Sequence, residues 1–169
     1  MVSLTNDIGK IFKWKHAFQT LLNCETDTHF DENNDTVNIL EHHNTEQLNQ
    51  GISLHDVHIA VRSLNKNKAP GHDEIPVEVI QSEPCIHFPH RLFCVCFETG
   101  KIPNSWNLGL ITPVKKQPMS DKRDPTNYRG IAVTGSIYKA YCAVINNRLT
   151  KWAEDNNVFA DEQNGFRRK

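Results

Sequence analysis

Apolar residues near the amino-terminal end recur at the spacing of one helix face, at positions 4, 8, 11, 12, 18, 21 and 22. This spacing predicts one amphipathic helix over residues 4–22. Residues 23–50 differ, because they are rich in Asn, Asp, Glu, His and Thr and poor in large apolar side chains. Such a segment buries too little apolar surface to offset the entropy lost on ordering, so we expect a flexible polar linker there.

Three short helices are predicted in the middle of the chain. Ser53 and Asp56 have the spacing of a capping box at the start of the first helix. Pro76 suits the first turn of the second helix, where a missing N–H costs no hydrogen bond. The third helix should follow Pro89 and end before Gly100, because glycine readily takes the left-handed conformation that follows a helix.

Residues 110–116 and 128–133 are predicted as two strands of one hairpin, joined by a polar loop that contains two prolines. Pro113 has no N–H to donate, so its strand is expected at an edge or a bulge. From about Ser136, apolar residues recur every three or four positions and predict a long helix. The expected buried aromatic residues of that helix are Tyr138, Tyr141 and Trp152. A helix-rich α+β fold with a small antiparallel sheet is therefore expected.

Length and composition favour one intracellular domain. The chain has 169 residues, about the size of a single domain. Its five cysteines are odd in number and irregular in spacing, which argues against a disulfide framework and for a reducing compartment. No apolar run approaches the roughly 18 residues that span a membrane. The sequence begins without the basic and apolar blocks of a signal peptide. We expect a location in the nucleus or the cytoplasm, without membrane association.

The net charge of −1 conceals an asymmetry along the chain. Residues 1–100 carry seven Lys/Arg and fourteen Asp/Glu, whereas residues 101–169 carry twelve and six. A basic half favours a polyanionic partner, although chance clustering of solvated charges would give the same count.

Lys115, Lys116 and Arg129 lie where the two predicted strands meet the loop. If the strands pair, Lys116 and Arg129 can lie near one another, and a mobile ammonium beside a planar guanidinium could hold a triphosphate. The alternative is a set of exposed basic residues that deters edge-to-edge pairing of strands.

A run of metal-ligating residue types, Cys85, His87, His90, Cys94 and Cys96, does not have zinc-site spacing. Cys94 and Cys96 are two residues apart on a predicted helix, so their side chains point to different faces. No metal site is predicted here, and buried thiols are the simpler interpretation.

Five motifs carry a family resemblance. They are KWKHAFQTLLN at residues 13–23; KAPGHDEIP at 68–76; GKIP at 100–103 with Trp106 and ITPVKK at 111–116; NYRGI at 127–131; and QNGFR at 163–167. In this order they resemble the reverse transcriptases of non-LTR (LINE-type) retrotransposons, over nearly the whole chain and more weakly before about residue 50. The resemblance implies part of a right-hand polymerase, with fingers and the start of the palm over residues 51–169. Residues 1–22 would then be a helix before the polymerase, and 23–50 a linker.

The resemblance also implies roles for individual residues. Lys116, with Lys115 beside it, and Arg129 match the fingers residues that contact the triphosphate of the incoming dNTP. Residues near the template path or the template–primer are Lys68, Pro70, Gly71, Gln163, Gly165, Phe166 and Arg167. The implied partners are an RNA template and a DNA primer. Trp106, Tyr128 and Phe166 could stack on bases or equally pack in a core.

The chain departs from the family at two points. Glu74 stands where the family usually has glycine, which would strain the loop if that position needs a positive φ. The family's chemistry uses two Mg²⁺ ions held by aspartates, and this chain has no Asp-Asp pair and no match to those ligands.

We therefore expect a fragment of an RNA-directed DNA polymerase that lacks the remaining palm and thumb, binds no metal and does not polymerise alone. The alternative is a domesticated, non-catalytic module that binds nucleic acid or protein, with the acidic first half and residues 23–50 as its partner surface.

Overall fold

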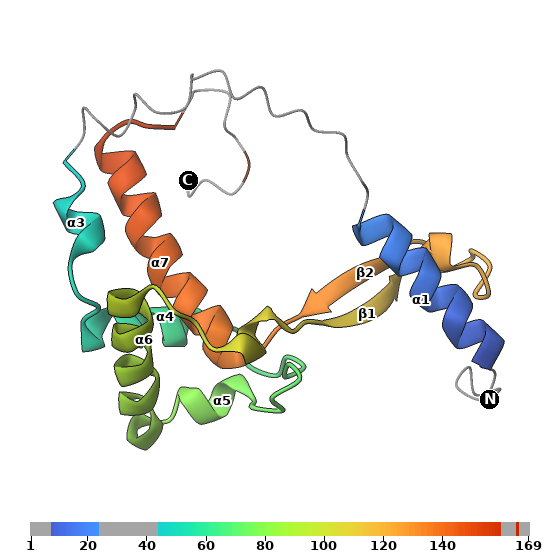
Figure 1. The fold of residues 1–169 in the computed structure, drawn as a ribbon, viewed down its shortest axis with the longest axis horizontal. Helices are drawn as coiled ribbons and strands as arrows, with labels where there is room; N and C mark the ends of the chain where they lie inside the picture. Colours follow the sequence, from blue (N-terminus) through green and yellow to red (C-terminus); the bar gives the residue numbers. More distant parts are fainter. Residues whose placement is uncertain (1–7, 24–43, 160–164, 166–169) are drawn as a thin grey trace. The chain divides into compact units, whose positions relative to one another are not determined.

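A computed structural model of the chain describes residues 8–23, 44–159 and 165, which form two compact units (Figure 1). The hairpin unit comprises residues 8–23 and 110–133. The helical unit comprises residues 44–109 and 134–159, together with residue 165. Helices dominate and the described sheet is a single antiparallel pair, so the fold class is α+β.

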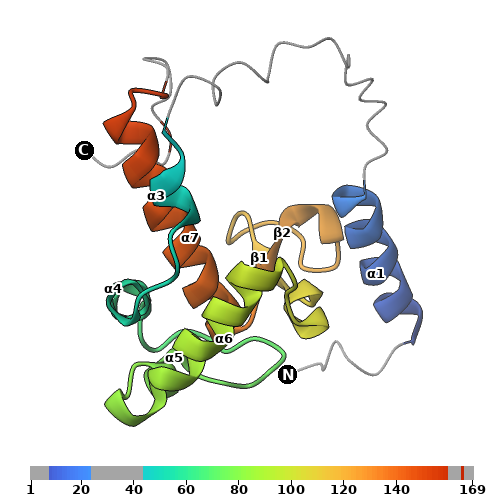
Figure 2. The same cartoon turned by 60° about the vertical axis from the view of Figure 1, so that its left-hand side comes forward.

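The hairpin unit contains α1 (Ile8–Leu22), β1 (Leu110–Lys115), the 3-10 turn η3 (Pro125–Asn127) and β2 (Tyr128–Val133). The strands pair from Leu110 opposite Val133 to Lys115 opposite Tyr128, so the predicted hairpin is confirmed. The next backbone hydrogen bond runs from Lys116 N to Asn127 O at 2.8 Å, at the start of the loop. In both views α1 lies beside this hairpin (Figures 1 and 2).

Aromatic packing explains why α1 docks on the strands. The rings of Trp14 and Tyr128 meet edge-to-face, with centroids 4.7 Å apart. Gly130 lies under the next turn of the helix, and a Cβ added there would sit 3.0 Å from two ring atoms of Phe18. Glycine at position 130 therefore lets the helix approach the strand more closely than any other residue would.

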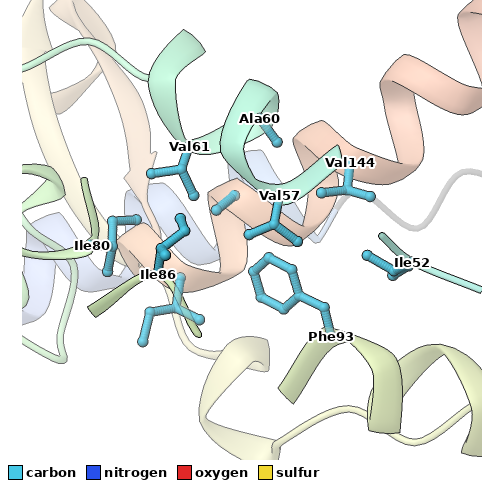
Figure 3. Packing of buried hydrophobic residues seen from close by; sticks show 10 residues of the cluster. Ile52, Val57, Ala60, Val61, Ile80, Ile86, Phe93 and Val144 are labelled. Carbon is cyan, nitrogen blue, oxygen red and sulfur yellow. The ribbon is translucent and has the colours of Figure 1, made fainter. Parts of the chain in front are cut away.

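The helical unit is built around three helices that share one buried cluster. Its elements are α3 (Glu46–Asn49), α4 (Leu54–Ser63), α5 (Val77–Ile80), η1 (Glu83–Cys85), α6 (His87–Thr99), η2 (Asn104–Asn107) and α7 (Ser136–Asp155). Phe93 of α6 is fully buried and points toward Val57 of α4, beside Val144 of α7 (Figure 3). Burial of each such side chain contributes about 1.5–3 kcal/mol, so this cluster holds α4, α6 and α7 together.

Most helix ends agree with the sequence analysis. The capping box of α4 is confirmed, because Ser53 Oγ accepts from Asp56 N at 3.1 Å and Asp56 Oδ2 accepts from Ser53 N at 3.1 Å. Gly100 follows α6 in the left-handed conformation, with φ of 66°. The predicted start of α6 was wrong, because the helix begins at His87 and Pro89 lies within its first turn. A proline is tolerated there, since the first N–H groups of a helix have no partner within it.

One side chain fastens the segment before α4 to α7. Arg148 of α7 donates to Gln50 O, to Gly51 O at 2.6 Å and to Asp56 Oδ2 at 2.9 Å. Its guanidinium also lies 5.3 Å from the centre of the Phe97 ring. Burial works against the carboxylate, yet hydrogen bonds from Arg148 and Ser53 lower the pKa of Asp56.

Part of the region predicted as a linker is described. Residues 24–43 lie outside the described residues, and α3 forms one helical turn after them. Trp152 Nε1 donates to Asn44 O at 2.9 Å, so the chain just before α3 contacts α7. Among the helices of the described ranges, none is long and apolar enough to cross a membrane.

Candidate phosphate-binding surface

The basic residues are concentrated in one of the two units. Residues 8–23 and 110–133 of the hairpin unit carry eight Lys/Arg and two Asp/Glu. The described residues of the helical unit carry eight Lys/Arg and nine Asp/Glu. The basic region therefore includes α1, which belongs to the acidic half of the sequence and contains Lys13 and Lys15.

The loop between the strands orients both predicted lysines. Lys115 Nζ donates to Pro118 O at 2.7 Å, and Lys116 Nζ donates to Thr126 O at 2.8 Å. Each ammonium uses one of its three donors in this bond, so it keeps capacity for an anion. Lys115 is half-buried and Lys116 is exposed, which makes Lys116 the more accessible cation.

Arg129 points to the face of the hairpin opposite to Tyr128. It follows Tyr128, whose ring contacts α1, and successive side chains of a strand point to opposite faces. Arg129 is exposed, and within the described residues no hydrogen bond or ion pair holds its side chain. The register puts Arg129 opposite Val114, whereas Lys116 lies at the start of the loop. The register therefore keeps Lys115, Lys116 and Arg129 together at the loop end of the hairpin.

The charges of Lys13 of α1 and of Lys116 both act on the carboxylate of Asp124. Asp124 Oδ1 accepts from Thr126 N at 3.0 Å. This hydrogen bond, assisted by the positive charges of Lys13 and Lys116, lowers the pKa of Asp124. Lys13 was not among the predicted phosphate-binding residues, since residues so far apart along the chain carry no local signal that they act on the same group.

Two hollows flank the line along which α1 packs on the hairpin. The larger is a groove of about 930 Å³ between α1 and the strands, and its walls include Trp14, Phe18, Tyr128 and Lys15. The smaller, of about 390 Å³, is lined by Lys116 and by residues of α1 and η3. Phe18 and Tyr128 belong to both linings and form the ridge between the hollows.

The motif at residues 68–76 has a structural role in the helical unit. Gly71 is buried, and a Cβ added to it would lie 2.5 Å from Gly135 N, so the loop and the start of α7 touch backbone to backbone. Asp73 Oδ1 accepts from Ile75 N at 3.3 Å, so Asp73 caps its own turn. Glu74 has φ of 54°, so this position does use the left-handed conformation.

The other predicted template-proximal residues differ in how they are placed. Lys68 is exposed and Pro70 is half-buried in the loop before Gly71. Gly165 is exposed. Gln163, Phe166 and Arg167 lie outside the described residues.

Several aromatic and thiol groups of the helical unit lie in its core or pack against it. Trp106 packs against Phe93, Tyr138 and Tyr141, with ring centroids 5.2 to 6.2 Å apart within the cluster. His90 Nε2 lies 3.0 Å and Cys94 Sγ 3.4 Å from the same carbonyl oxygen, that of Ile52. Burial raises the pKa of the Cys96 thiol. Within the described ranges, no group of three or more His, Cys, Asp or Glu side chains could hold a metal ion.

Curated proteins of mobile elements match the chain. The probable RNA-directed DNA polymerase from transposon X-element of Drosophila melanogaster is 32% identical over 111 residues, which are 64% of this chain and 12% of that protein. The probable RNA-directed DNA polymerase from transposon BS of that species is 25% identical over 118 residues, 69% of this chain and 13% of the relative. A putative 115 kDa protein in the type-1 retrotransposable element R1DM of Drosophila melanogaster is 26% identical over 106 residues, which are 62% of this chain and 10% of that protein. No family model matches the chain.

These similarities identify a region related to RNA-directed DNA polymerases, that is, to reverse transcriptases. More particularly, the chain is related to a segment of the reverse transcriptases of non-LTR retrotransposons. It spans between 10% and 13% of the length of these curated relatives.

Proposed function

We propose that the hairpin unit is the phosphate-binding part of the fingers of a retrotransposon reverse transcriptase. Lys116 and Arg129 would contact the triphosphate of the incoming dNTP, and Lys115 would support the loop between the strands. The observation that carries this proposal is the excess of basic residues in the hairpin unit, with Lys116 held at its exposed loop end. The names of the relatives support it, because two of them are RNA-directed DNA polymerases.

The helical unit would contribute to the template path and the start of the palm. Exposed Lys68 is the residue of its loop best suited to a template phosphate, because its charge is accessible. Pro70 and Gly71 would act by shaping that loop. Gln163, Gly165, Phe166 and Arg167 would lie near the template–primer, as the resemblance implies. An RNA template and a DNA primer are thus the proposed partners, in the nucleus or the cytoplasm.

The metal-dependent step would require residues outside this chain. In the family, Mg²⁺ stabilises the attacking and leaving oxygens of nucleotidyl transfer. The described residues do not fit such a site, because no carboxylate cluster able to hold a metal ion occurs among them. We therefore propose that the 169-residue chain binds primer–template and nucleotide but does not extend a primer.

Binding of a labelled primer–template duplex across a salt series tests this function. Wild-type affinity should fall steeply as salt rises, because each phosphate contact releases counterions. The Lys116→Ala/Arg129→Ala variant should bind more weakly and with a shallower salt dependence. Lys101→Ala/Lys151→Ala is the matched control, since it removes two exposed lysines of the helical unit. Equal binding by the two double variants would refute the role of Lys116 and Arg129.

A primer-extension assay with Mg²⁺ and dNTPs, run on the same samples, tests the second part. We expect no extension product from the chain alone. A product that disappears on treatment with a metal chelator would show that a catalytic site is present.

A further inference from the structure

The groove between α1 and the strands combines features that the proposed triphosphate contacts do not use. Its walls carry the rings of Trp14, Phe18 and Tyr128, and its lining also includes Lys15. All of these residues belong to the hairpin unit. An open groove with aromatic walls next to basic side chains has the composition of surfaces that bind single-stranded nucleic acid.

The aromatic walls suit nucleobases. Trp14 and Tyr128 meet edge-to-face with an interplanar angle of 71°, an arrangement in which the rings do not stack on and cover one another. Phe18 lies 6.0 Å from Trp14, measured between ring centres, and extends the same apolar wall. Gln19 and Asn23 add amide groups to the lining, and amides can form hydrogen bonds with base edges. A groove of about 930 Å³ is large enough for more than one base.

Basic side chains lie on both flanks of the ridge formed by Phe18 and Tyr128. Lys15 lines the groove, and Lys116 lines the smaller hollow with His16. Lys13 is close enough to Asp124 to act on its carboxylate together with Lys116. Phosphates that follow bases placed in the groove would therefore meet cations contributed by both α1 and the hairpin.

We propose that α1 and the hairpin together bind a single-stranded segment of nucleic acid, with bases in the groove and phosphates on Lys13, Lys15 and Lys116. This site rests on the proposed function and extends it, because it assigns α1 to the nucleic-acid surface. An apolar protein segment would also fit the walls, but it would gain nothing from a unit with eight Lys/Arg and two Asp/Glu. The charge therefore decides in favour of a polyanion.

The test is binding of the full chain to a labelled single-stranded oligonucleotide of about a dozen nucleotides, within the usual size range of such sites. Lys13→Gln/Lys15→Gln should lower the slope of log affinity against log salt by about 1.4, since each single-strand phosphate contact contributes about 0.7. Lys101→Gln/Lys151→Gln, which changes the same charge in the helical unit, should leave the slope unchanged. Trp14→Leu should weaken binding roughly five- to 150-fold through lost stacking.

Because Trp14 also packs on Tyr128, the lysine variant is the decisive one: Gln keeps the helix and removes only charge. If Lys13→Gln/Lys15→Gln matches the control while Lys116→Ala/Arg129→Ala still weakens duplex binding, the α1 site is refuted and the proposed function stands. If the wild type binds neither duplex nor single strand, both are refuted. If the wild type binds no oligonucleotide but binds an apolar dye that Trp14→Leu releases, the groove is a site for a protein segment and the proposal is wrong.

Discussion

Arg148 is predicted to be the most important single polar residue for the stability of the helical unit. It joins α7 to the carbonyl groups of Gln50 and Gly51 and to the Asp56 carboxylate. Its side chain is 14% exposed, so most of these bonds are shielded from water. Hydrogen bonds that involve a charged group contribute about 1.5–3 kcal/mol each, but Asp56 is 34% exposed and the ion pair deserves a lower value.

We expect Arg148→Met to reduce the free energy of unfolding by about 3–4 kcal/mol at neutral pH, because the hydrogen bonds to the two backbone carbonyls and to Asp56 are lost, while Met still covers the Phe97 ring with an apolar side chain. Arg148→Lys should cost about 1–2 kcal/mol, since an ammonium keeps the charge but cannot span three acceptors. Urea denaturation followed by the helical circular dichroism signal measures both values. Lys151→Met on the same helix is the control and should change stability by less than about 0.5 kcal/mol.

The same variant should change the dependence of stability on pH. The folded-state pKa of Asp56 is lowered, so its contribution to stability is present above the unfolded pKa and is lost as the pH falls through the folded pKa. The difference between wild type and Arg148→Met should therefore shrink as the pH is lowered below about 4. A destabilisation below about 0.5 kcal/mol, or one that is independent of pH, would refute the role assigned to Arg148.

Three further changes should have effects of known sign. Glu74→Gly should stabilise the helical unit by about 0.5–1 kcal/mol in urea denaturation, because Glu74 has φ of 54°; Glu74→Ala keeps a Cβ and should give no such gain. Gly130→Ala should destabilise the hairpin unit by about 1–3 kcal/mol, because the added Cβ would lie 3.0 Å from the Phe18 ring. Limited proteolysis should then cut α1 faster than in the wild type. Adding Phe18→Leu to this variant should restore resistance to the protease. Ser53→Ala should cost about 1 kcal/mol through loss of the α4 cap, whereas Ser63→Ala at the far end of α4 should cost less.

Elements with a local signal were predictable from the sequence. The capping box at Ser53 and Asp56, the hairpin strands and the long helix from Ser136 follow from residues that are neighbours along the chain. Strain at Glu74 was expected if this position has a positive φ, and its φ of 54° is positive. Such features depend on backbone sterics and periodicity, which operate within a few residues.

Contacts between distant segments were not predictable in this way. Trp14 and Tyr128 pack together, and Arg148 reaches the carbonyl groups of Gln50 and Gly51, yet nothing near either residue indicates its partner. Lys13 was overlooked for the same reason, although its motif had been noted. Backbone acceptors in particular are the same at every residue, so sequence cannot show which carbonyl an arginine will bind.

The pairing of α1 with the hairpin has a consequence for synthesis on the ribosome. Phe18 is made early and Gly130 late, and the whole first segment of the helical unit is translated between them. At typical rates of about 5–20 residues per second, α1 waits several seconds for the strands that cover it. During this interval its apolar residues, among them Trp14 and Phe18, are available to chaperones. Slow translation through the hairpin would lengthen that exposure and lower the yield of folded chain.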